Sequence, residues 1–296
     1  MSFSSPWRYD QVQAFPPAGV TADGAAAKQF FAARPSWSAP ERCGVVTAGD
    51  DCYFPGVQML ALSVAGRCPL CVFDLGLGVQ QRGWLAGQGV RVVEVMESDL
   101  VVPSAEPMWQ TWNKPAFLAA SPFECSLWID CDAFVVADLT PLFLVADRQP
   151  LVFRHPDPCF FQPKNSSGLY DQFPVSPRRV ACGVQAAVVG VADGRDHGLL
   201  GEWQKACGRF RCRDVAGLVK CWDQGALLWA LEKLDLGFLA REAGGWNRFA
   251  WPAGSFGLGD VKSFFDSFRP VLDDVILHFV GRPKYWVNWG KYVSLG

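Results

Sequence analysis

The stretch LWIDCDAFVVADLTPLF, residues 127–143, places two carboxylates between two apolar runs. Leu127–Ile129 forms the first run and Phe134–Val136 forms the second, with Asp130 and Asp132 between them. Both runs have the composition of buried strands, and a carboxylate left unpaired in such surroundings is costly. We therefore expect these two acids to have a specific use.

The position of the acids indicates a bound cation. In an open parallel sheet, ligands bind beyond the carboxyl ends of the strands, and Asp130 and Asp132 follow directly where the first apolar run ends. Carboxylate oxygens suit Mg²⁺ and Mn²⁺, and an added imidazole favours Mn²⁺. An Asp-x-Asp tripeptide can also merely cap the following turn, which is the alternative interpretation.

Composition limits the class of protein. The 296 residues are 50% hydrophobic, enough for a sizeable core in one large domain or two small ones. A net charge of -2 gives no electrostatic bias toward nucleic acid or an anionic membrane. The N-terminal sequence lacks a signal-peptide pattern, and the apolar stretches are shorter than the ~18 residues of a membrane span, so we expect a soluble, cytoplasmic protein.

The eleven cysteines are expected to be free thiols, because the chain is long and its cysteine count is odd. Cys68 and Cys71 have the spacing of a redox or zinc motif. A structural zinc site needs two further ligands, and only the looser pair Cys207 and Cys212 is available. A metal-binding or interaction module built on Cys68 and Cys71 remains a minor alternative.

Strand-like and helix-like segments alternate along the first half of the chain. This alternation is typical of βαβ units and predicts a Rossmann-like, mostly parallel central sheet flanked by helices in a single α/β domain. The strand-like segments are CGVVTAGD (43–50), PLCVFDLG (69–76), VRVVEVM (90–96) and SLWI (126–129). The second half adds expected strands at 151–157, 179–191 and 275–280, and expected helices at 198–210 and 222–234.

Residues 127–143 closely resemble the signature of family 8 glycosyltransferases, which are retaining enzymes of the GT-A fold that include glycogenin and bacterial lipopolysaccharide galactosyltransferases. That family carries an Asp-x-Asp motif after an apolar strand, followed by an acid, a Leu and a Pro-Leu-Phe-like sequence. This chain supplies Asp130, Asp132, Asp138, Leu139 and Pro141–Phe143. Four other segments resemble the family in the same order, and the five motifs together cover roughly residues 44–288.

Two of these segments lie in the first half. VVTAGDDCY (45–53) is similar to the family's opening strand, whose end holds uracil and ribose, and WNKPAFL (112–118) is similar to a motif with a basic residue before a helix. The resemblance implies that Lys114 faces the diphosphate or the donor sugar. It also implies nucleotide contacts at Thr47, Ala48, Asp50, Tyr53 and Cys131, although Cys52 replaces a polar residue that is often found in the family.

The other two segments lie in the second half. WDQG (222–225) resembles an Asp-Gln-Gly motif at a helix start, which implies that Asp223 and Gln224 lie against the reacting face of the donor; helix capping by Asp223 is the alternative. LHFVGRPKYW (277–286) resembles the family's closing block. There the resemblance implies that His278 is the third metal ligand, that Gly281 lets backbone approach phosphate and that Lys284 binds diphosphate.

The resemblance implies a metal-dependent retaining glycosyltransferase. The enzyme would use Mn²⁺ (or Mg²⁺), held by Asp130, Asp132 and His278, to move a hexose from a UDP-sugar to a glycan, glycolipid or glycoprotein acceptor. Residues 1–40 would be a peripheral arm, 41–150 the nucleotide-binding half and 151–296 the acceptor-binding and closing half. Ala181 replaces a frequent Asn, so the identity of the donor sugar does not follow from the resemblance.

Two further interpretations belong to other classes. A sugar-nucleotide binding protein without turnover is compatible with the departure at Ala181. A nucleotidyltransferase shares a similar sheet and metal acids, but it would need a glycine-rich loop after the first strand, where this chain has TAGDDCYFPG (47–56). Aromatic residues between the last two motifs predict an acceptor surface, with simple core packing as the alternative: Trp246, Phe249, Trp251 and Phe256.

Overall fold

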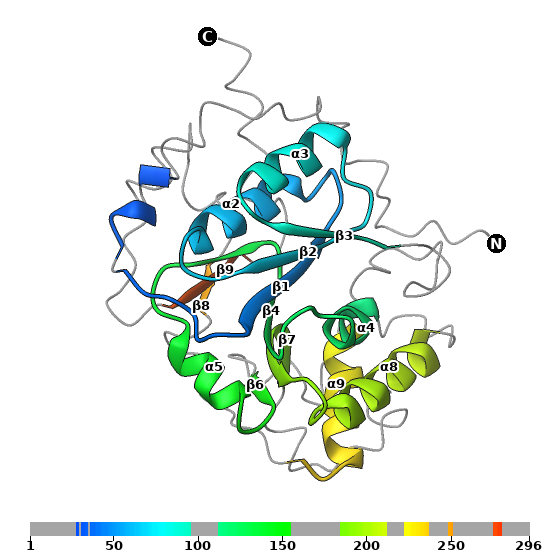
Figure 1. Ribbon diagram of the computed structural model, residues 1–296. Coiled ribbons are helices and arrows are strands. Elements are labelled where there is room, and N and C mark those ends of the chain that lie inside the picture. The colour runs from blue at the N-terminus through cyan, green and yellow to red at the C-terminus, as the bar shows by residue number, and fades with distance from the viewer. Residues whose placement is uncertain are drawn as a thin grey trace, which may run out of the picture.

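The computed structural model describes residues 28–29, 31–34, 36–95, 112–154, 184–211, 222–236, 248–250 and 275–279. Across these ranges, a central sheet carries helices on both faces (Figure 1). This arrangement confirms the predicted α/β class with a mostly parallel sheet in a single domain. No helix in the described ranges is long and apolar enough to cross a membrane.

The central sheet has six strands in the order β3-β2-β1-β4-β7-β6. β1 pairs in parallel with β2 and β4, β2 pairs in parallel with β3, and β7 runs antiparallel to both β4 and β6. Within this sheet β7 is therefore the one reversed strand. The bounds are β1 Cys43–Gly49, β2 Leu70–Asp74, β3 Arg91–Glu94, β4 Cys125–Ile129, β6 Leu151–Arg154 and β7 Val184–Ala192.

Successive strand residues point to opposite faces of the sheet, so apolar side chains project from both faces and helices pack on both. Val45 packs in a core cluster with α2, α3 and α5, whereas Val46 packs in a second cluster with α4, α8 and α9. Proline stands in the first turn of α2, α4 and α5, where its missing N–H is no loss. The bounds are α2 Phe54–Val64, α3 Val79–Gly87, α4 Lys114–Ala119, α5 Thr140–Ala146, α8 His197–Arg211 and α9 Trp222–Lys233.

A second sheet of three strands, in the order β5-β9-β8, was not predicted. Its strands are β5 Ala133–Val135, β8 Arg248–Ala250 and β9 Ile276–Phe279. The sequence pattern predicted one continuous strand and its exit over residues 126–136, but a turn in which the Ala133 N–H donates to the Asp130 carbonyl (3.0 Å) separates β4 from β5. The two acids therefore lie where the central sheet ends and the second sheet begins, between β4 and β5.

Part of the expected N-terminal arm packs on the core. Phe31 is only 2% exposed, and its ring centroid lies 5.5 Å from that of Phe134 in an edge-to-face contact. The guanidinium of Arg67 donates a hydrogen bond to the Phe31 carbonyl (2.6 Å). These contacts join the segment to α2 and β5, and the division at residue 40 stays a prediction.

Candidate metal centre

Asp130, Asp132 and His278 bring three potential metal-ligand atoms within 4.8 Å of one another. His278 Nε2 lies 3.0 Å from Asp132 Oδ1 and 3.9 Å from Asp130 Oδ2. Asp132 and His278 are buried, and Asp130 is partly exposed. Two carboxylates and one imidazole in this geometry fit a divalent cation such as Mn²⁺.

The fold explains why these residues meet. Asp130 follows β4, and its N–H donates to the Ala187 carbonyl of β7 (2.9 Å), which fixes the start of the turn. Asp132 immediately precedes β5, and the register of the second sheet places Ala133 opposite His278 of β9. The imidazole of His278, which is distant in the sequence, therefore lies beside the two acids.

The two oxygens of Asp130 have different surroundings. Oδ1 accepts a hydrogen bond from Trp128 Nε1 (2.6 Å) and forms an ion pair with Lys114 Nζ (2.8 Å). Oδ2 is the oxygen that faces His278. Because the first oxygen is fixed by two donors, the second is presented toward the position between the three ligands.

Lys114 links Asp130 to Asp223. Its Nζ lies 2.8 Å from Asp223 Oδ2 and also donates to the Ala186 carbonyl (3.2 Å), while the residue is only 5% exposed. Burial alone would lower the pKa of Lys114, but the adjacent carboxylates outweigh burial and raise it above its ordinary value. The ammonium is therefore charged, and its expected contact with a diphosphate or donor sugar stays a prediction.

The two residues expected at the reacting face lie in the first turn of α9. Asp223 is buried beside Lys114, so its carboxylate belongs to the same charge group as Asp130 rather than acting as a helix cap alone. Burial raises the pKa of the Asp223 carboxyl, and Lys114 opposes that rise. Gln224 Oε1 is buried and has no hydrogen-bond partner among the residues described.

The predicted nucleotide-binding residues of the first motif lie at or beyond the carboxyl end of β1. Val46 of β1 pairs with Trp128 of β4, so Ala48 and Asp130, each two residues further on, approach the same edge of the sheet. Thr47 is fully buried, and its Oγ1 has no hydrogen-bond partner in the described part of the chain. This buried hydroxyl is the second orphaned polar group among the predicted site residues.

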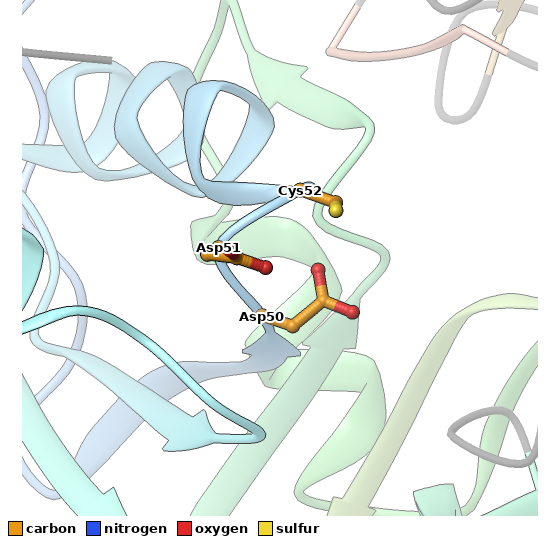
Figure 2. Close-up of side chains that lie close together, drawn as sticks. All are labelled: Asp50, Asp51 and Cys52. Atoms are coloured by element: carbon orange, nitrogen blue, oxygen red, sulfur yellow. The ribbon is translucent and has the colours of Figure 1, made fainter. Parts of the chain in front are cut away.

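Asp50 and Tyr53 lie between β1 and α2. Asp50 Oδ1 accepts a hydrogen bond from the Tyr53 N–H (3.0 Å), and burial raises the pKa of the Asp50 carboxyl. Figure 2 shows the side chains of Asp50, Asp51 and Cys52 on one side of this turn, and their potential ligand atoms lie within 4.8 Å of one another. Burial and the two acids raise the pKa of the Cys52 thiol to about 11, so at neutral pH it is a poor metal ligand.

The structure describes only some of the remaining predicted positions. Cys131 lies between the two acids and packs partly buried against the core. Asp138, the third acid of the opening stretch, accepts a hydrogen bond from the Thr140 N–H (2.8 Å) at the start of α5. Gly281, Lys284 and the aromatic residues Trp246, Trp251 and Phe256 lie outside the described residues.

The alternative built on Cys68 and Cys71 gains no support. Both thiols are buried around β2, and burial raises the pKa of Cys68 to about 12 and that of Cys71 to about 11. A metal ligand must be a thiolate, which these surroundings oppose. Among the residues that the structure describes, neither group of metal-binding side chains includes them.

Two residues that contact the candidate metal ligands were not identified from the sequence. Trp128 was taken only as a strand residue, although its indole N–H binds Asp130. Gln185 Nε2 lies 3.1 Å from His278 Nδ1. The signal for Gln185 was available, since it is one amide in the otherwise apolar run VQAAVVGVA (184–192).

The fold and this site were compared with known proteins. No family model and no curated protein sequence matches the chain. Solved structures do match it: the bifunctional glycosyltransferase WbbM has a TM-score of 0.57 at 12% identity, over 84% of this chain and 47% of WbbM. The galactosyltransferase LgtC, solved with donor and acceptor sugar analogues, has a TM-score of 0.54 at 16% identity, over 85% of this chain and 94% of LgtC.

A third similar structure is the glycosyltransferase GlyE of Streptococcus pneumoniae, with a TM-score of 0.50 at 17% identity, over 87% of this chain and 61% of GlyE. The chain thus spans about half of WbbM but nearly all of LgtC. At these identities the likeness establishes the fold, which is the GT-A glycosyltransferase fold. The predicted fold is confirmed, and the neighbours support the resemblance to family 8 glycosyltransferases.

Proposed function

We propose that the protein is a metal-dependent retaining glycosyltransferase that moves a hexose from a UDP-sugar to a glycan, glycolipid or glycoprotein. The observation that carries this proposal is the meeting of Asp130, Asp132 and His278 at the carboxyl edge of a GT-A sheet. These three residues come from distant parts of the chain and match two separate motifs of the family. A random acidic cluster would not be expected to combine this position with this ligand set.

The charge balance of the centre favours a cation. The centre has three carboxyl groups, those of Asp130, Asp132 and Asp223, and one ammonium, that of Lys114, which pairs with Asp130 and Asp223. If all three carboxyl groups are ionised and the imidazole is neutral, three negative charges against one positive charge leave an excess of two. A divalent ion held by Asp130, Asp132 and His278 would offset this excess and stabilise the charge that develops on a departing diphosphate.

Protein side chains already hold the carboxyl groups of Asp130 and Asp223 in fixed orientations beside the position proposed for that ion. Trp128 and Lys114 fix one oxygen of Asp130, which leaves the other oxygen as a ligand of defined orientation. On the other side, Lys114 holds the Asp223 carboxylate in the same buried group. Preorganised charges of this kind need no rearrangement when the leaving group develops its charge.

The orphaned polar atoms support donor binding. A buried acceptor without a partner costs about 1–3 kcal/mol, and a ligand hydroxyl or amide can remove that cost. We assign Gln224 Oε1 to the donor sugar and Thr47 Oγ1 to the nucleoside. The neighbours also include an active-site variant of LgtC in which a glutamine is replaced by glutamate, so a glutamine serves in that enzyme's active site.

Other residues complete the proposed nucleotide site. Ala48, Asp50 and Tyr53 would line the uridine beyond β1, with Cys131 beside the metal ligands. Gly281 and Lys284 would contact the diphosphate. Retention is compatible with a covalent carboxylate intermediate and with front-face attack, in which the acceptor enters beside the leaving diphosphate.

The test measures UDP released from a panel of UDP-sugars with and without Mn²⁺. We expect wild-type protein to release UDP slowly by hydrolysis, only when Mn²⁺ is present, and faster with a suitable acceptor. Asp132→Ala should lower the rate about 10²-fold or more, as loss of an electrostatic catalytic group does. The matched control is Asp138→Ala, which removes an acid of the same stretch that binds only the start of α5 among the described contacts.

Other outcomes identify the alternatives. Near-normal turnover by Asp132→Ala would contradict the metal-dependent proposal. Binding of UDP-sugar without any release of UDP would indicate a non-catalytic binding protein. Release of pyrophosphate from a nucleoside triphosphate and a sugar phosphate would indicate a nucleotidyltransferase.

A further inference from the structure

Gln185 is a buried polar residue that the proposed reaction does not use. It lies in β7, is 1% exposed and is flanked in sequence by the apolar residues Val184 and Ala186. Its amide nitrogen lies 3.1 Å from Nδ1 of His278, on the side of the imidazole opposite to the two acids. Gln185 therefore contacts His278 through the ring nitrogen that does not face the two acids.

The contact determines where the imidazole carries its proton. With the amide N–H donating to Nδ1, that nitrogen is the acceptor and a neutral ring carries its proton on Nε2. Nε2 then donates to Asp132 Oδ1 at 3.0 Å. A metal ligand requires the other tautomer, in which Nε2 is bare and Nδ1–H faces an acceptor.

We propose that Gln185 is a positioning residue that holds His278 through Nδ1 in either tautomer and so fixes the direction in which its Nε2 faces. The inference rests on the proposed function, because it concerns the same metal centre. An amide has a donor at one end and an acceptor at the other. Gln185 therefore matches the metal-free tautomer as the structure shows it, and matches the metal-binding tautomer when its oxygen faces Nδ1.

The position of Gln185 in the sheet suits this task. β7 is paired on both sides, with β4 and β6, and Gln185 stands opposite Phe153 of β6. Gln185 itself lies in the ladder with β6, and the ladder with β4 holds the same strand from Val188 onward. Partners behind a ligating histidine typically change metal affinity by about 10- to 100-fold when they are removed.

The first experiment compares Mn²⁺ affinities of two variants, measured with Mn²⁺ alone by the EPR signal of the free ion at about pH 8, above the ordinary pKa of histidine. Gln185→Glu offers Nδ1 only oxygens and so favours the metal-binding tautomer. Gln185→Leu offers neither donor nor acceptor. We expect Gln185→Glu to bind Mn²⁺ about 10- to 100-fold more tightly than Gln185→Leu.

A double-mutant cycle separates the effect transmitted through His278 from the direct effect on the cation of the carboxylate charge that Gln185→Glu introduces. The same two substitutions are made in a His278→Ala background, where no imidazole can transmit the effect. The difference in affinity between Gln185→Glu and Gln185→Leu should then largely disappear. A difference of the same size in both backgrounds would mean that the introduced carboxylate acts through space on the cation, and would overturn the inference.

The second experiment reads the tautomer directly. The chain has three histidines, so the imidazole ¹⁵N signals of the metal-free protein can be assigned with His278→Ala. We expect Nδ1 of His278 to carry no proton in the wild type and to carry one in Gln185→Glu, whose carboxylate can only accept a hydrogen bond. An unchanged tautomer would overturn the inference, and this measurement needs no apolar variant that could fail to fold.

The outcomes separate this inference from the proposed function. Wild-type protein that binds no Mn²⁺ would overturn both. Wild-type protein that binds Mn²⁺, together with equal affinities in Gln185→Glu and Gln185→Leu, would overturn the role of Gln185 and leave the metal centre standing.

Discussion

Each charged side chain at the candidate metal centre is held by a protein partner. Trp128 and Lys114 bind Asp130, Lys114 binds Asp223, and Asp132 faces His278. Such a network replaces hydration for groups that are mostly buried, and breaking one member would leave a partner charged and unpaired. At the scale of single residues, the site is therefore arranged before any ligand binds.

Asp50 gives a prediction about pH. Burial raises the pKa of its carboxyl in the folded protein, so between the ordinary pKa and the raised value the folded state binds more protons than the unfolded state. This group's contribution to the free energy of unfolding therefore falls as pH rises through that window. Asp50→Asn keeps an oxygen for the Tyr53 N–H and removes the titration.

We therefore expect the stability of Asp50→Asn relative to wild type to increase as the pH rises above the ordinary pKa of an aspartic acid, and to level off once the folded-state carboxyl is fully ionised. Urea unfolding of both proteins across this range measures the difference. A difference that does not change with pH would show that Asp50 titrates as it does in the unfolded chain. A difference that shrinks as pH rises would contradict the sign of the shift.

The single-residue roles were predictable from the sequence to different extents. Asp130, Asp132 and His278 match a spaced motif and do meet in the structure. The partners of Lys114 were not predictable, because its ion pairs depend on how α4 and α9 pack relative to β4 and β7. Gln185 stood out as one amide in an apolar run, but its partner His278 could not be predicted because β9 lies far away in the sequence.

At the scale of elements, β7 organises the second half of the fold. It runs antiparallel between β4 and β6, carries Gln185, and accepts the N–H of Asp130 through the Ala187 carbonyl. Near its end it passes close to α5 and β6: a Cβ added at Gly190 would lie 2.7 Å from Ala146 Cβ and 2.8 Å from Leu151 Cβ. These two Cβ atoms belong to α5 and the start of β6. They cannot move aside unless the backbone shifts, whereas the far end of a flexible side chain could.

Gly190→Ala should therefore destabilise the protein by about 1–3 kcal/mol through overpacking. The matched control is Gly201→Ala in α8, where an added Cβ meets nothing within 4 Å. In a helix interior that change is expected to stabilise by about 0.5–1 kcal/mol. Urea unfolding measures the change in the free energy of unfolding for each variant. Equal changes would show that α5 and β6 can move away from β7 at little energetic cost.

The pattern of elements was predictable where it is local. Apolar strands alternating with helical segments indicated the parallel part of the central sheet, because neighbouring βαβ units form from nearby sequence. The second sheet was not predictable in the same way. β5 and β9 are short, lie far apart in the sequence, and pair only after the turn at Asp130–Ala133 has redirected the chain.

At the scale of the whole molecule, two cores on opposite faces of the central sheet support one site at its edge. One core packs α2, α3 and α5 together with β5 and β9, and the other packs α4, α8 and α9. The candidate metal ligands follow β4, precede β5 and lie in β9, while Lys114 and Asp223 lie at the starts of α4 and α9. The site therefore depends on both cores, so stability of the whole domain and integrity of the site are linked.

The N-terminal segment extends the first of these cores. Trp37 and Ala39 pack against this core, and Phe31 packs separately against Phe134 of β5. The Ala39 N–H also donates to the Arg67 carbonyl after α2 (2.7 Å). A peripheral arm would contribute little to the free energy of unfolding, whereas a buried phenylalanine is part of the cooperative unit.

Phe31→Ala should therefore lower the free energy of unfolding by about 3–5 kcal/mol, as truncation of a fully buried aromatic side chain does. Chemical unfolding should still show a single transition, shifted to lower denaturant, because the segment unfolds with β5 and α2. The control is Val79→Ala in α3, whose side chain is 77% exposed and whose truncation should change stability by less than about 0.5 kcal/mol. If Phe31→Ala matches the control, or produces a separate early transition, the segment up to residue 40 is an arm with its own weak stability. A large loss in a single transition would place the domain boundary before Phe31.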